Sequence, residues 1–245
     1  MTENKIVLRA ENITKLFGGL RAIDNASMHL MEGEILGLIG PNGAGKTTMF
    51  NMISGTVPLT SGKIYVNDQY IPKPAAHKMS AIGIGRTYQV VQPFSNLTVV
   101  ENTMVGAFLR NKHPEKAREK SMKVLKFLDL AQKADTPGKD LSLIDLKRME
   151  IARALATEPT ILLLDEVLAG LNPTNRDVVM EMIREINKSG VSIIIIEHVM
   201  RAVMGLCNRI YVLSEGKMIA EGTPDEISNN EEVIESYLGG KKAHA

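Results

Sequence analysis

The chain carries, near its N-terminus, the segment Gly40-Pro41-Asn42-Gly43-Ala44-Gly45-Lys46-Thr47. It fits the pattern G-x-x-x-x-G-K-[ST], in which backbone N–H groups converge on a phosphate and a helix dipole adds positive potential. Residues 34–39 before it have the composition of a buried strand, and residues 46–54 after it that of a helix which Gly55 ends. A chance match is expected in roughly one per cent of chains of this length. The segment therefore predicts a phosphate loop between a strand and a helix.

This loop predicts a site for a nucleotide and Mg²⁺. The Lys46 side chain would reach the β- and γ-phosphates, and the Thr47 hydroxyl would bind the metal. The remaining predicted contacts come from the loop itself, at Gly40, Asn42, Gly43, Ala44 and Gly45.

Composition narrows the class of protein. The chain has 245 residues, 44% of them hydrophobic, which is enough for a sizeable core. A net charge of +1 gives no electrostatic footprint for nucleic acid. The single Cys207 excludes an internal disulfide and favours a reducing compartment. Apolar runs are too short to span a bilayer, and the first residues lack a signal peptide. We expect a soluble, cytoplasmic protein; at a membrane, another subunit would span it.

Strand-like and helix-like segments alternate, which predicts an α/β fold with a largely parallel sheet. Short strands are expected at residues 5–10 and 26–30, joined by a loop, and another at 82–89. Residues 97–157 are expected to form an inserted helical subdomain, in which the basic run 112–126 is a solvated face. The whole chain, 1–245, is expected to be one domain with a flexible tail at 239–245.

Phe17 is a candidate contact to the nucleotide base. It stands beside two glycines in the expected loop between residues 10 and 26, and an exposed aromatic ring there could stack on a base. A plain core residue is an equally good interpretation.

Polar side chains follow three predicted strands. Asp165 and Glu166 end the apolar run 161–164, Gln89 ends the strand at 82–89, and His198 follows the apolar run 191–196. In a parallel sheet these ends share one edge. Asp165 would hold Mg²⁺, and Glu166 would orient or deprotonate the attacking water. Gln89 would sense the metal and water, and His198 would bond the γ-phosphate.

Together these motifs resemble the ATP-binding subunit of an ABC transporter over nearly the whole chain. The match comprises, in order, Phe17, the phosphate loop 40–48, Gln89, the signature position Leu141-Ser142, the strand 161–166, the D-loop 169–172 and the switch histidine His198. More narrowly, the chain is similar to ATPase subunits of branched-chain amino acid importers. That likeness rests on residues 17–20, 85–89, 93–94, 96–99, 101–102, 169–173 and 232–239.

The resemblance implies a P-loop core with an antiparallel β subdomain and a helical subdomain. It implies that two such domains enclose two ATP molecules, each held by one chain's phosphate loop, including Thr48, and the other chain's Ser142. It also implies membrane-spanning permease subunits as partners, contacted by the region after Gln89, and a substrate-binding protein that acts indirectly. The chain would lie on the cytoplasmic face of the cell membrane.

The signature departs from the family pattern. The family has Leu-Ser-Gly-Gly-Gln, whereas this chain has Leu141-Ser142-Leu143-Ile144-Asp145. The glycines let the backbone approach the opposite ATP; here Ile144 is branched, and Asp145 brings a negative charge whose repulsion costs about 1 kcal/mol or more. A milder interpretation is that Ser142 and the helix dipole suffice. Val167 replaces a usual proline, with little expected effect.

The departure suggests a hypothesis about assembly. This chain's own ATP would be hydrolysed if a partner supplies a complete signature, whereas the partner's ATP would be hydrolysed poorly. An asymmetric heterodimer of two ATPase subunits is therefore favoured over a homodimer.

Three other functions compete with import: a lipid or lipopolysaccharide exporter ATPase, a soluble ABC ATPase of DNA repair or translation, and a nucleotide-binding module without turnover. Neutral charge and the lack of coiled coils, zinc motifs or a second ATPase domain disfavour the soluble class, and Glu166 and His198 disfavour the inactive one.

Overall fold

The computed structural model describes residues 5–89 and 93–238, so the expected tail at 239–245 lies outside the described residues. The chain divides into two compact units, which are described separately. Among the described residues, the first comprises 5–78 and 194–238, and the second 79–89 and 93–193.

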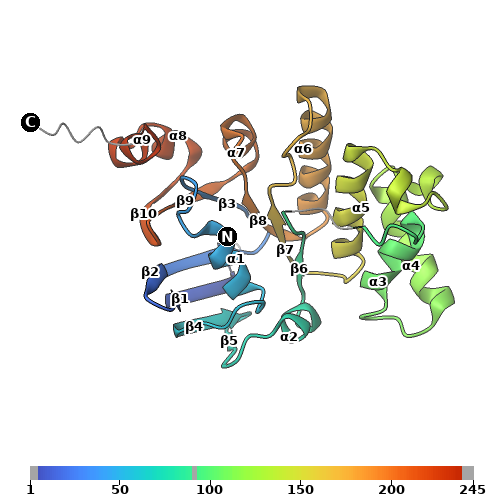
Figure 1. Ribbon diagram of the computed structural model, residues 1–245, viewed down its shortest axis with the longest axis horizontal. Coiled ribbons are helices and arrows are strands. Elements are labelled where there is room, and N and C mark those ends of the chain that lie inside the picture. The colour runs from blue at the N-terminus through green and yellow to red at the C-terminus, as the bar shows by residue number, and fades with distance from the viewer. Residues whose placement is uncertain (1–4, 90–92, 239–245) are drawn as a thin grey trace, which may run out of the picture. The chain divides into compact units, whose positions relative to one another are not determined.

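An antiparallel sheet forms one part of the first unit. Its strands lie in the order β2-β1-β4-β5; in Figure 1 they are the blue and teal arrows. Strand β1 (Ile6–Phe17) pairs with β2 (Leu20–Met31) and with β4 (Ser61–Val66), and β4 pairs with β5 (Gln69–Tyr70).

The long hairpin of β1 and β2 corrects one prediction. Strands were expected only at residues 5–10 and 26–30, with a loop between them, but the ladder continues to Phe17 paired with Leu20. Ile13 and Ile23 are completely buried on one face of this extension, which is why the pairing persists. Gly18 adopts a φ of +56° in the turn, a conformation that glycine adopts without strain.

The phosphate-loop motif lies in the other part of the first unit. Strand β3 (Ile35–Ile39) leads into it, and α1 (Lys46–Ile53) follows. Strand β9 (Arg209–Ser214) is parallel to β3 and antiparallel to β10 (Lys217–Gly222). The unit also contains α7 (Met200–Leu206), α8 (Pro224–Ser228) and α9 (Glu231–Leu238).

The second unit combines a parallel strand pair with most of the helices. Strand β6 (Ile84–Arg86), shorter than predicted, lies parallel to β7 (Ile161–Asp165). Two elements cross the boundary between the units, α2 (Ala76–Ala81) and β8 (Ser192–Ile196). The helices that belong to this unit are α3 (Val99–Ala107), α4 (Pro114–Phe127), α5 (Leu143–Leu155) and α6 (Pro173–Lys188), with 3₁₀ turns η1 (Ala131–Lys133) and η2 (Gly138–Asp140).

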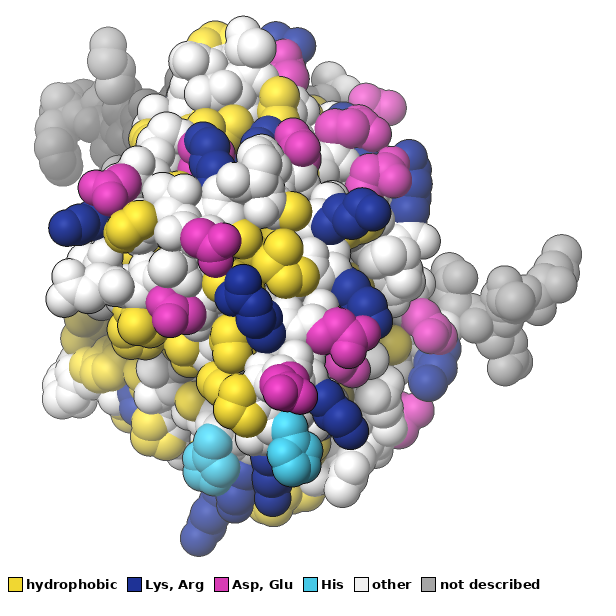
Figure 2. Space-filling view, turned by 90° about the vertical axis from the view of Figure 1, so that its right-hand side faces the viewer, with side chains coloured by type: hydrophobic (Ala, Val, Ile, Leu, Met, Phe, Trp, Pro, Cys, Tyr) yellow, Lys and Arg dark blue, Asp and Glu magenta, His cyan; other side chains and the backbone are white. Residues whose placement is uncertain are grey.

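Helices α3, α4 and α5 pack together through small side chains. Ala107, Ala117 and Ala156 form a fully buried cluster, against which Met104 packs. Helix α4 buries only Ala117, Ser121 and Leu125, so its basic residues face outward as predicted. Figure 2 shows basic and acidic side chains interspersed with apolar ones on one face of the molecule. Among the described residues, no helix has the length and apolar character needed to cross a bilayer.

Candidate nucleotide-binding and hydrolysis site

The phosphate loop has the backbone that the motif predicts. All of β3 is buried, and the chain then turns through Gly40 into the loop. Gly45 precedes α1 with a φ of +106°, and a Cβ there would lie 2.6 Å from the carbonyl oxygen of Ala22. Only glycine fits this position without moving β2.

The side chains of the loop are arranged for an anion. Lys46 is 6% exposed, and its Nζ donates to the carbonyl oxygens of Gly40 at 2.7 Å and Pro41 at 3.0 Å. Its ammonium group thus lies over the loop. Thr47 is exposed in the first turn of α1, and Thr48 is half-buried. Of the other predicted contacts, Asn42 and Gly43 are exposed and Ala44 is buried.

In the second unit, two sequence-predicted carboxylates end β7. Asp165 is fully buried, and its Oδ2 accepts a hydrogen bond from Arg86 Nη2 at 3.1 Å. Glu166 follows, half-buried, with a φ of +51°. Gln89 Nε2 donates to Glu166 Oε2 at 3.1 Å, so the structure brings these two predicted residues into contact.

Two further predicted residues belong to the first unit. His198 follows β8 and is exposed. Phe17 is 48% exposed at the end of β1, and Lys15 Nζ lies 4.9 Å from the ring centroid. The interpretation of Phe17 as a core residue is therefore wrong, whereas stacking on a base stays a prediction.

The altered signature begins helix α5. Ser142 is its N-cap, with Oγ accepting from the Asp145 amide at 3.4 Å. The Asp145 carboxylate also binds the Ser142 hydroxyl and accepts from Lys133 Nζ at 2.5 Å. Burial acts to raise the pKa of Asp145, but the hydrogen bonds from Lys133 and Ser142 hold it below its usual value. Asp145 is 4% exposed and turned into the protein, so the repulsion expected from its charge is offset by Lys133.

Several residues at this site were not found from sequence. Lys133 on Asp145 and the buried Lys147 and Glu150 of α5 match no motif, and the contact of Arg86 with Asp165 was not predicted. A usable signal existed only for Lys147 and Glu150, which carry opposite charges at i and i+3 of the expected helical segment.

The residues present fit MgATP. Glycines and a buried lysine form the loop, and the hydroxyl of Thr47 and the carboxylate of Asp165 are the hard oxygen donors that Mg²⁺ prefers. Within the described residues no cluster of three or more His, Cys, Asp or Glu could hold a metal alone. Mg²⁺ is ordinarily held by one or two protein oxygens together with substrate phosphates.

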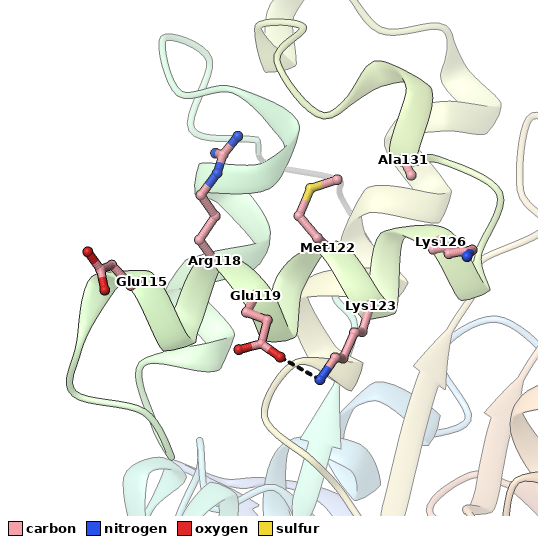
Figure 3. A pocket seen from close by; sticks show the side chains of 7 residues that line it. All are labelled: Glu115, Arg118, Glu119, Met122, Lys123, Lys126 and Ala131. Atoms are coloured by element: carbon pink, nitrogen blue, oxygen red, sulfur yellow. Dashed lines mark hydrogen bonds and ion pairs between the residues drawn. The ribbon is translucent and has the colours of Figure 1, made fainter.

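A groove of about 590 Å³ lies along α4, apart from the predicted site residues. Figure 3 shows that charged side chains of both signs line it, with an ion pair between Glu119 and Lys123 at 2.7 Å. Met122 is the main apolar contribution. Its mixed charge favours neither a phosphate nor a metal.

Comparison with known proteins agrees with this geometry. Residues 23–169 match the family model described as ABC transporter, and residues 217–243 match that of the branched-chain amino acid ATP-binding cassette transporter. The high-affinity branched-chain amino acid transport ATP-binding protein LivG of Salmonella typhimurium is 38% identical over 95% of this chain and 98% of that protein. The lipopolysaccharide export system ATP-binding protein LptB of Escherichia coli is 37% identical over 95% and 97%. A nucleotide-free ATP-binding cassette from an ABC transporter superposes with a TM-score of 0.88 at 32% identity, over 96% of this chain and all of that one.

A phosphate loop, a buried Asp165 and a following Glu166 define a P-loop ATPase, and the chain belongs to the ATP-binding subunits of ABC transporters. The predicted fold is confirmed: an antiparallel β subdomain and a mixed, mostly parallel sheet with helices. The predicted resemblance to importer ATPases, with ATP hydrolysis coupled to transport, is confirmed as well. Subunits of this family bind ATP, work with permease subunits and dimerise.

Proposed function

We propose that this chain hydrolyses MgATP to power the import of branched-chain or other hydrophobic amino acids. The observation that carries the substrate class is the match of residues 217–243 to the branched-chain amino acid cassette model, joined to the 38% identity with LivG along 95% of the chain. The subunit would act on the cytoplasmic face of the cell membrane, beneath permease subunits that the region after Gln89 contacts.

The predicted residues divide the chemistry between them. The phosphate loop with Lys46 would bind the phosphates. Thr47 and Asp165, with Gln89, would hold Mg²⁺, whose charge would offset that of the phosphates. Glu166 orients or deprotonates the attacking water, and His198 bonds the γ-phosphate. Phosphoryl transfer of this kind depends on positioning and charge stabilisation. The hydrogen bond between Gln89 and Glu166 supports their joint action on the water.

Uptake by the assembled transporter tests this function. The chain and its permease subunits are reconstituted in vesicles. The substrate-binding protein is added on one side of the membrane, and ATP and Mg²⁺ on the other side. We expect uptake of leucine, isoleucine or valine, and its loss with Glu166→Gln, which leaves ATP bound. Extraction of lipopolysaccharide without amino acid uptake would instead support the exporter, which the 37% identity to LptB keeps as the second candidate.

We also infer that the partner ATPase is a different chain. In this chain the Ser142 hydroxyl is held by Asp145, whose carboxylate is in turn held by Lys133. A hydroxyl committed in this way is a poor donor to a phosphate, and Ile144 stands where the family has glycine. Both features support an assembly with one efficient ATP site, the one completed by the partner's signature.

Size exclusion of the purified Glu166→Gln variant with ATP and Mg²⁺ tests this inference. The substitution removes hydrolysis, so any ATP-dependent dimer accumulates. We expect a monomer with ATP bound, and a dimer only after the second ATPase subunit is added. A dimer of this chain alone would show that residues 141–145 still close over ATP and would support the homodimer.

A further inference from the structure

Helix α5 carries a buried pair of opposite charges one turn apart. Lys147 is 3% exposed and Glu150 is 2% exposed. Lysine and glutamate are almost never buried unless paired, because removing a charge from water is costly. Burial raises the pKa of Glu150, while the Tyr88 amide and the positive charge of Lys147 act in the opposite direction. Such a pair persists in a core when it makes specific contacts with the surrounding chain.

Each member of the pair contacts main-chain atoms next to the predicted catalytic residues. Lys147 Nζ donates to the carbonyl oxygen of Glu166 at 3.2 Å. Glu150 Oε1 accepts from the backbone N–H of Tyr88 at 2.8 Å, and Tyr88 immediately precedes Gln89. One turn of α5 therefore holds the backbone at the ends of both β6 and β7.

The two segments held in this way meet through their side chains. Gln89 Nε2 donates to Glu166 Oε2 at 3.1 Å. Glu166 also has a φ of +51°, a left-handed conformation that costs a non-glycine residue of order 1 kcal/mol and persists only where surrounding contacts impose it. The contact from Lys147 falls on the carbonyl of this strained residue.

We propose that Lys147 and Glu150 are positioning residues that fix Gln89 and Glu166 relative to each other and tie them to the signature helix. The proposal rests on the role of Glu166 in the proposed function. Since Ser142 caps the same helix five residues before Lys147, a shift of α5 would move the signature and the backbone of the hydrolytic residues together.

Steady-state kinetics of the assembled ATPase test the positioning role of Lys147. Lys147→Met keeps the length of the side chain and removes its donor and charge. We expect kcat to fall about ten- to a hundredfold, as small displacements of reacting groups do, with nucleotide affinity within about twofold because the phosphate loop is untouched. Lys147→Arg keeps a charged donor and should recover most of kcat. Arg148→Met is the matched control, since Arg148 bonds the carbonyl of Asp129 instead, and its kcat should stay unchanged.

Two substitutions of Glu150 test its positioning role independently of Lys147. Glu150→Gln keeps an oxygen that accepts from the Tyr88 amide and should retain kcat, whereas Glu150→Leu removes it and should lower kcat. In a Gln89→Ala background, Glu150→Leu should cause little further loss, because its effect passes through Gln89. Thermal unfolding of each variant separates this effect from simple destabilisation.

The outcomes distinguish the positioning role of Lys147 and Glu150 from the proposed hydrolysis of ATP, on which it rests. If Glu166→Gln abolishes turnover but Lys147→Met and Glu150→Leu keep normal kcat, the positioning role is wrong and the proposed hydrolysis stands. If Glu166→Gln itself leaves turnover unchanged, the role of Glu166 fails, and this proposal with it. A fall in nucleotide affinity equal to the fall in kcat would also overturn the positioning role.

Discussion

At the scale of single residues, the exposed ring of Phe17 offers a direct test of base stacking. The ring stands free of the core at the end of β1, with a lysine ammonium against it. Aromatic stacking contributes about 0.5–1.5 kcal/mol beyond burial. Phe17→Ala should therefore weaken ATP binding about threefold to tenfold, whereas Phe17→Tyr should not, as measured by titration with a fluorescent ATP analogue.

Leu20 is the matched control for that measurement. It pairs with Phe17 across the hairpin turn and is 68% exposed, so Leu20→Ala removes an apolar side chain from the same tip without removing a ring. Equal weakening by both substitutions would mean that the hairpin tip acts through its shape, and base stacking by Phe17 would be excluded.

The altered signature allows a gain of function. In the assembled transporter, Glu166→Gln silences this chain's own ATP, so the remaining turnover belongs to the ATP that faces residues 142–145. Adding Ile144→Gly and Asp145→Gln frees the Ser142 hydroxyl and opens the backbone. Because the Ser142 hydroxyl can then donate to the phosphate, we expect this turnover to rise by roughly tenfold or more. Steady-state ATP hydrolysis measures the rise.

The control applies the same two substitutions when the partner's own catalytic glutamate is changed instead. Turnover then comes from this chain's ATP, which residues 144 and 145 of this chain do not face, so the rate should stay constant. If the two substitutions also fail to raise the turnover of the ATP that faces residues 142–145, Ile144 and Asp145 do not limit its hydrolysis.

At the scale of elements, the start of α3 depends on a capping box. Thr98 Oγ1 accepts from the Glu101 amide at 3.3 Å, and the Glu101 carboxylate accepts from the Thr98 amide at 2.8 Å. Thr98→Ala removes the cap and should destabilise the protein by about 1 kcal/mol, whereas Thr98→Ser should retain the cap. Urea denaturation of the three proteins measures this, and equal midpoints for all three would show that α3 is held by packing alone.

Elements next to a motif were predicted best from sequence. The helix after the phosphate loop forms as α1, and the apolar runs before Asp165 and Glu197 form the buried strands β7 and β8. Helix α2 was not predicted, because it has six residues, below the length at which local propensity forms a helix. The hairpin extension was missed because cross-strand pairing decided it.

The site divides in the same way. Residues in motifs were predicted, since each motif states a chemical task. Lys133, Lys147 and Glu150 were not, because their function depends on contacts with residues 12 to 62 positions away, such as Asp145 and Tyr88. A sequence read alone gives no register for contacts of that range.

At the scale of the molecule, one guanidinium joins the sheets of the first unit. Arg209 of β9 bonds the Glu34 carboxylate at 2.9 and 3.0 Å, the Glu221 carboxylate of β10, and the carbonyl oxygen of His29 in β2 at 3.0 Å. Tyr211 completes the group: its hydroxyl accepts from Arg209 at 3.2 Å and lies 3.1 Å from His29 Nδ1. The antiparallel sheet is thus tied to the phosphate-loop strands by a charged cluster.

This cluster makes the stability of the fold depend on pH. Burial first, and the positive charge of Arg209 second, lower the pKa of His29, while Glu221 and Glu34 act in the opposite direction. A histidine whose pKa is lowered on folding stabilises the protein fully above its unfolded pKa, about 6.5, and that contribution is lost as the pH falls through the folded value. The urea concentration at the unfolding midpoint should therefore decrease as the pH is lowered from 7.5 to 5.5, and His29→Gln should make this fall smaller. His77→Gln, at an exposed position of α2, should leave the fall unchanged. Identical falls in the wild-type and His29→Gln proteins would show that His29 takes up its proton as readily in the folded cluster as in the unfolded chain.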